Sequence, residues 1–130
     1  MISYARQDQE DGAASTAAEE HIAPAPRVSV QAFCETVETA AAVQSAGEDR
    51  RLDKAHLKIQ MGGMTAAIEA YRTAPTPNVI LLETEGRNDI LSALDQLATV
   101  CDAGTRVIVI GRVNDVVLYR ELVRRGISDY

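Results

Sequence analysis

The sequence predicts an α/β fold built on a doubly wound parallel sheet. From residue 27 onward, short apolar blocks alternate with longer segments in which apolar residues recur at helical spacing. No two-residue hairpin signal lies between consecutive blocks, so each pair of strands is joined by a long crossover, as parallel strands require. A length of 130 residues suits one domain with one core.

Four segments are predicted to be strands. Residues 28–33 and 56–61 alternate apolar and polar side chains with period two. Residues 79–82 and 107–110 are apolar at every position, which is typical of central parallel strands covered on both faces. The order of the four blocks along the chain gives four strand-helix units.

A helix is predicted after each strand from the spacing of its apolar residues. The four sets lie at 37–43, 66–71, 90–101 and 116–123, with a loop expected at 47–53. Gly62 and Gly63 mark the turn into the second helix, and Gly126 is placed to end the fourth. The first helix is expected to begin near Glu35.

Residues 1–26 are predicted to form a flexible acidic leader, and residues 27–130 the folded domain. The leader contains five acidic residues against one arginine and has almost no large apolar side chain. Such a stretch buries too little surface to offset the entropy of ordering it. We therefore expect it to contribute little to folding.

Composition narrows the classes of function. The formal net charge of −6 argues against nucleic acid as a partner. Cys34 and Cys101 have no metal-binding or disulfide spacing, and neither a signal peptide nor a membrane span is recognisable. Glu83, Glu85 and Asp89 are carboxylates of the kind that bind hard cations, but a solvated acidic loop is the preferred interpretation. We expect a cytoplasmic protein with free thiols, no metal and no cofactor.

Three stretches carry a resemblance to a known family. They are residues 63–70, 78–82 and 122–130, and the family is that of the receiver domains of two-component response regulators. Residues 63–70 resemble the second loop of a receiver and the helix after it, and residues 78–82 resemble its third strand. Residues 122–130 resemble its fourth helix and the start of its fifth strand. The resemblance covers the chain from about residue 27 to its end. It implies the receiver (flavodoxin-like) architecture, truncated around the fifth strand.

The residues at the receiver's functional positions differ from the family pattern. Glu83 matches the phosphoacceptor aspartate, Gly111 matches the hydroxyl residue after the fourth strand, and Tyr130 stands where the fifth strand opens. Only Glu35 is acidic where receivers carry the acidic pair that holds magnesium. These departures predict a degenerate phosphoacceptor position at Glu83 and degenerate switch positions at Gly111 and Tyr130. Glu83 is then either a mimic of a phosphorylated aspartate or, preferably, a polar residue at a strand end.

Among degenerate receivers, the chain is similar to the N-terminal domain of the CpaE (TadZ) pilus assembly family. The leader rich in alanine and ending in prolines, the Glu83-Thr84-Glu85 sequence and the ending 125–130 carry this resemblance. It implies a ParA/MinD-type ATPase domain downstream, and no Gly-rich lysine loop occurs in these 130 residues.

The expected function is that of a non-enzymatic interaction and localisation domain of the Flp/Tad pilus machinery. Its partners would be proteins of that machinery, which would recruit it to the cell pole or inner membrane. A homodimer is expected because residues 107–110 would leave a sheet edge unpaired. The alternatives are a phosphorylatable receiver and a small flavodoxin-like enzyme. Arg120, Arg124 and Arg125 mark either an interaction surface or a helix end favoured by its dipole.

Overall fold

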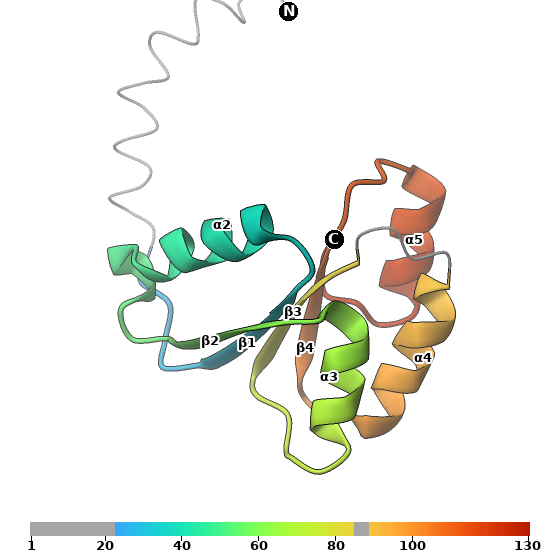
Figure 1. Ribbon diagram of the computed structural model, residues 1–130, viewed down its shortest axis with the longest axis horizontal. Coiled ribbons are helices and arrows are strands. Elements are labelled where there is room, and N and C mark those ends of the chain that lie inside the picture. The colour runs from blue at the N-terminus through green and yellow to red at the C-terminus, as the bar shows by residue number, and fades with distance from the viewer. Residues whose placement is uncertain (1–22, 85–88) are drawn as a thin grey trace, which may run out of the picture.

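The computed structural model describes residues 23–84 and 89–130, which form a parallel four-stranded sheet with helices on both faces (Figure 1). The elements in chain order are β1 (Ser29–Cys34), α2 (Val37–Gly47), a 3-10 turn (Arg50–Leu52), β2 (His56–Met61), α3 (Gly63–Tyr71), β3 (Val79–Glu83), α4 (Ile90–Val100), β4 (Arg106–Ile110) and α5 (Val116–Arg124). The predicted α/β fold class is confirmed.

The order of strands across the sheet is β2-β1-β3-β4. The chain moves from β1 to β2 on one side and then returns to place β3 on the other side of β1. Crossovers therefore diverge between β1 and β3, and in open α/β sheets a crevice forms at the carboxyl ends of such strands. Phe33 pairs with Leu82, and Glu83 pairs with Ile110, which aligns the three strand ends at this edge.

Two layers of apolar side chains cover the sheet. On one face α3, α4 and α5 pack over the main core, whose largest fully buried members include Phe33, Met64, Ile80, Leu82, Leu97 and Leu122. On the other face α2 covers a smaller cluster of Ala32, Cys34 and Val43 (Figure 1). Successive strand residues face opposite layers, which is why buried strands read as unbroken apolar runs.

The predicted elements agree with the observed ones to within a few residues. α2 begins at Val37, with Thr36 as its N-cap, so the expectation that Glu35 opens this helix is wrong. Thr36 takes the N-cap position because its hydroxyl accepts a hydrogen bond from a free backbone N–H of the first turn. Glu35 cannot take over this role and lies before the helix. The predicted loop at 47–53 contains the short turn Arg50–Leu52, capped by Asp49.

The last helix is the one whose buried face differs most from its sequence pattern. Of the apolar residues that predicted it, only Leu122 is buried, while Val116, Tyr119 and Val123 are exposed. Gly126 does end the helix, with a φ of 99°. Ile127 donates its N–H to the carbonyl of Leu122 at 3.1 Å and packs in the same core, as in a Schellman motif.

Two further expectations concern the two ends of the chain. Most of the leader, residues 1–22, lies outside them, but the backbone N–H of Ala25 bonds to the carbonyl of Arg51 at 2.7 Å. At the other end, Asp129 forms a parallel bridge with Ile108. The carbonyl of Val107 and the N–H of Val109 are therefore bonded to residues 128 and 129, so this edge is less open than expected.

Candidate functional site

The candidate site lies at the carboxyl ends of β1, β3 and β4, where the crossovers diverge. Glu83 is the last residue of β3, and only 3% of it is exposed. Gly111 follows Ile110, the β4 partner of Glu83, so the predicted acceptor and switch positions share one edge. The structure thus brings together the residues that sequence analysis selected.

Both carboxylate oxygens of Glu83 are bound by the turn between β1 and α2. Oε1 accepts from the backbone N–H of Glu35 at 2.6 Å and of Thr36 at 2.9 Å. Oε2 accepts from the hydroxyls of Thr36 and Thr39, each at 2.9 Å. Glu83 therefore faces the loop between β1 and α2, where it is buried and bound rather than solvated.

The position of this turn explains why a carboxylate is stable there. Thr36 is the N-cap of α2, and its hydroxyl also accepts from the N–H of Thr39 at 3.2 Å. The first turn of a helix has unpaired N–H groups and a partial positive charge, both of which favour an anion. Burial by itself raises the pKa of Glu83, but the hydrogen bonds from Glu35, Thr36 and Thr39 outweigh it and hold the pKa below its usual value.

Tyr130 and Gly111, the two predicted switch positions, are in contact. The Tyr130 ring lies over Gly111, and its hydroxyl donates to the carbonyl of Val113 at 2.8 Å. The tyrosine therefore fastens the loop after β4 to the last residues of the chain. Sequence analysis assigned the two positions separately. The contact between them becomes visible only in the folded chain.

Within the part of the chain that the structure describes, the other candidate groups do not assemble into a catalytic set. The Glu35 side chain lies beside Gly63, because a β-carbon built on Gly63 would meet the carboxylate of Glu35. Among residues 23–84 and 89–130, no three His, Cys, Asp or Glu side chains are grouped to hold a metal, and Glu85 lies outside these ranges. Burial and then the negative charge of Glu83 raise the pKa of Cys34, which keeps it a neutral thiol.

Sequence reasoning missed the threonines that hold Glu83. A threonine just before a helical run is a recognisable N-cap signal, so Thr36 was available from the sequence. Its link to Glu83 was not, because the two residues are 47 positions apart. Only the parallel pairing of β1 with β3 brings them together.

No helix in the described part of the chain is long and apolar enough to cross a membrane. No protein-family model matches the sequence. A comparison with curated proteins gives no match either. Solved structures, however, do match.

The chain is similar to the pilus assembly protein CpaE from Caulobacter crescentus CB15, with 45% identity, a TM-score of 0.80 and coverage of 83% of each chain. It is also similar to a putative CpaE2 pilus assembly protein from Sinorhizobium meliloti 1021, with 40% identity and a TM-score of 0.76 over 79% of this chain and 85% of that one.

A CheY-like response regulator from Mesorhizobium loti shares 18% identity and a TM-score of 0.53, over 79% of this chain and 83% of that one. At this identity the likeness concerns the fold alone, and it confirms the predicted receiver architecture. The first two similarities extend over most of both chains at high identity. Together with the parallel sheet and its β2-β1-β3-β4 order, they establish that this chain belongs to the CpaE family of pilus assembly proteins.

Proposed function

We propose that this chain is a receiver-like domain through which a Flp/Tad pilus assembly protein binds its protein partners, without phosphorylation and without catalysis of its own. The observation that carries the proposal is the bonding of Glu83. A phosphoacceptor must offer a carboxylate oxygen in line with the donor phosphorus, beside a bound magnesium ion. Both oxygens of Glu83 instead accept bonds from the β1–α2 turn.

Two neighbouring residues support the same proposal. Gly111 has no hydroxyl to bond a phosphoryl group, and the Tyr130 ring lies over it. The Glu35 side chain packs against Gly63, and within the described residues no three acidic, His or Cys side chains are grouped to hold a metal ion. Phosphoryl transfer would need these groups together, since the charge on the phosphoryl oxygens must be stabilised.

The test uses the whole chain and a genuine response-regulator receiver as positive control. Each is incubated with acetyl phosphate and magnesium and weighed by mass spectrometry. We expect the control to gain a phosphoryl group and this chain to keep its mass. A stoichiometric gain by this chain would overturn the proposal and favour a phosphorylatable receiver with Glu83 as acceptor.

Binding is tested with purified pilus assembly proteins from the same gene cluster. We expect at least one of them to bind the immobilised chain, with the same affinity in the presence and absence of acetyl phosphate. A fluorescent fusion should then accumulate where that partner does, at the pole or the inner membrane. Uniform distribution together with no binding to any of the pilus proteins would contradict the proposed role.

Self-association is part of the proposal. On the α2 side of the sheet, Ile108 and Ile110 of β4 are only half-buried, and α2 packs over the other half of the sheet (Figure 1). An apolar strand near a sheet edge tends to recruit another chain. Light scattering at micromolar concentrations should give about twice the mass of one 14.0 kDa chain. A constant mass of one chain would remove the dimer from the proposal.

A further inference from the structure

Exposed apolar side chains gather on one helix. Seven large apolar side chains are exposed within residues 23–84 and 89–130, and five of them lie on α5 or the loop before it. These five, which are 42% to 72% exposed, are Val113, Val116, Val117, Tyr119 and Val123. Single exposed apolar residues are normal on a protein surface, but a cluster marks a site of interaction.

Three of these residues form a stripe along the helix. Val116, Tyr119 and Val123 follow the spacing of one helical face, and Arg120 lies on the same face. We call these four residues the outer face of α5. On the opposite face of α5, Leu122 is fully buried and Leu118 is partly buried against the main core.

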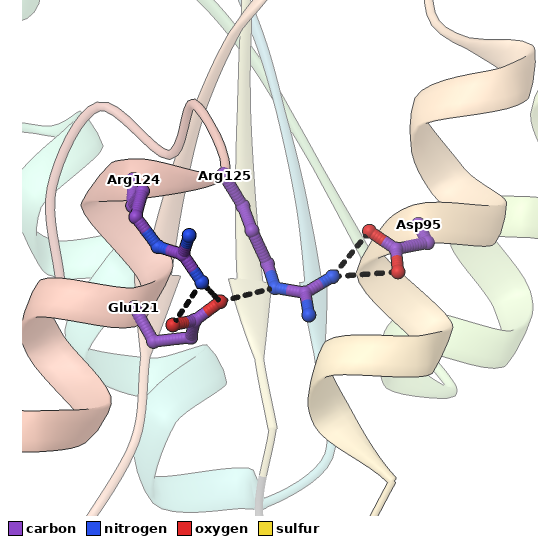
Figure 2. Close-up of polar contacts among 4 residues, drawn as sticks. All are labelled: Asp95, Glu121, Arg124 and Arg125. Carbon is purple, nitrogen blue, oxygen red and sulfur yellow. Dashed lines mark hydrogen bonds and ion pairs between the residues drawn. The ribbon is translucent and has the colours of Figure 1, made fainter.

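Local polar contacts stabilise α5, and one ion pair fixes its orientation against α4. At its start, the Asp115 carboxylate accepts from the N–H groups of Val117 and Leu118 at 2.8 and 3.5 Å. At its end, Nη1 of Arg125 lies 2.6 Å from both carboxylate oxygens of Asp95 on α4, and Nε donates to Glu121 at 3.0 Å (Figure 2). The helix cannot turn its apolar stripe inward without breaking the pair between Arg125 and Asp95 and exposing Leu122.

The same contacts leave the outer face positively charged. Glu121, the acidic residue within α5, already binds Arg124 and Arg125 (Figure 2). Within the described parts of the chain, Arg120 has no ion pair, and it is exposed. An apolar stripe with an unpaired arginine is unexpected on a chain whose net charge is −6. Complementary charge on a binding partner would be negative.

The charge and the residue types argue against two other occupants. If a second copy paired through this face about a two-fold axis, the two stripes and their arginines would be brought together, and like charges repel. Peripheral helices that enter membranes present Trp, Phe or Leu, whereas this face presents valines and one tyrosine. Tyrosine and arginine are instead enriched among the residues that dominate protein interfaces.

We infer that the outer face of α5 binds a protein segment whose apolar side chains are flanked by carboxylates. This inference rests on the proposed function as a protein-interaction domain, and it names the surface and the chemistry of the partner. Apolar contact with Val116, Tyr119 and Val123 would supply affinity. The charge of Arg120 would select the partner and speed its association.

The test uses two synthetic helical peptides with the same apolar stripe and a fluorescent label. One carries glutamates beside the stripe and the other carries lysines. In fluorescence anisotropy with the full chain at low salt, we expect the glutamate peptide to bind at least about tenfold more tightly, with the difference shrinking as salt is added. Equal affinities for the two peptides would overturn the inference.

Variants locate the binding and separate it from unfolding. Tyr119→Ala should weaken binding of the glutamate peptide about tenfold or more. Arg120→Glu should weaken that peptide and strengthen the lysine peptide, which a misfolded chain would not do. Val37→Ser, a change at a valine 75% exposed on α2, is the matched control and should change neither affinity.

Three other results would contradict the assignment. The first is a Tyr119→Ala variant that binds the glutamate peptide normally. The second is a dimer of the parent chain that this substitution dissociates. The third is binding to phosphatidylserine vesicles that depends on Tyr119 and occurs without binding to the peptide. If the peptide test fails while the chain still binds pilus assembly proteins, the surface is wrong and the proposed function stands.

Discussion

The ring of Tyr130 fills the space into which a side chain at position 111 would project. A β-carbon built on Gly111 would lie 2.5 Å from the Tyr130 hydroxyl oxygen and 3.0 Å from Cε1 of the ring. Carbon atoms are not found so close to a neighbour without one of them moving. Glycine at the end of β4 and tyrosine at position 130 therefore depend on each other.

Replacing Gly111 with alanine should displace the Tyr130 ring. The expected cost is about 1 kcal/mol in the free energy of unfolding, because the ring is only partly buried against the core and can shift. In a Tyr130→Ala background the same change should cost almost nothing. Urea denaturation of the four proteins measures this coupling, and an equal cost in both backgrounds would show that the two residues do not compete for space.

Removing the charge of Glu83 should destabilise the domain. We expect Glu83→Gln to cost about 2 kcal/mol, because hydrogen bonds to a buried charged group are lost, and Glu83→Ala to cost about 3 kcal/mol or more. Glu69→Gln is the matched control, since the Glu69 side chain is 75% exposed and its ion pair with Arg72 contributes little. A Glu83→Ala variant as stable as the parent would show that the four bonds contribute nothing net.

The contribution of Glu83 should also depend on pH. Its pKa is lower in the folded chain than in the unfolded one, so its stabilisation is complete above pH about 4.3 and is lost as the pH falls through the folded-state value. The difference in stability between the parent and Glu83→Gln should therefore be constant near neutral pH and shrink in acid. A difference that stays the same down to pH about 3 would contradict the direction of this shift.

Gly126 should resist substitution by any residue that avoids positive φ. No heavy atom lies within 4 Å of a β-carbon built there, so alanine meets no steric obstacle, and its cost of about 1 kcal/mol comes from the backbone alone. Asparagine tolerates this conformation and should cost less. Thermal melting of both variants checks the order, which would be reversed if the helix ended in another way.

Two truncations should separate the leader from the domain. Removing residues 1–22 should leave the melting temperature nearly unchanged, since they hold few large apolar side chains. Removing residues 1–26 also removes the bond from Ala25 to Arg51 and should cost roughly 1 kcal/mol. A loss of several degrees with the shorter truncation would mean that the leader packs on the domain.

The sequence was sufficient for the fold because its periodicity is local. The pattern of apolar residues within each strand indicates which of its faces are covered. Glycines at positions 62, 63 and 126 indicate where the backbone adopts a positive φ. The candidate site was predictable only in part. The resemblance to receivers identified Glu83, Gly111 and Tyr130, but the contacts of Glu83 with Thr36 and Thr39 and of Gly111 with Tyr130 join distant parts of the chain.

The orientation of α5 also lay beyond the sequence pattern. Its valines and Tyr119 repeat at helical spacing, and such a stripe normally faces the core. The helix instead buries Leu122 and is held by the bond from Arg125 to Asp95 on α4. An ion pair between two helices cannot be read from either helix alone.

The internal bonding of the Glu83 carboxylate bears on how quickly the domain can respond. A regulator switched by an acyl phosphate retains its signal until that bond is hydrolysed, however briefly it met its donor. If the domain acts without phosphorylation, as proposed, because its carboxylate is held by the turn at Glu35 and Thr36, no such record is kept. The state of the domain would then last only as long as each complex, so it would follow the local concentration of the partner with a delay set by the dissociation rate.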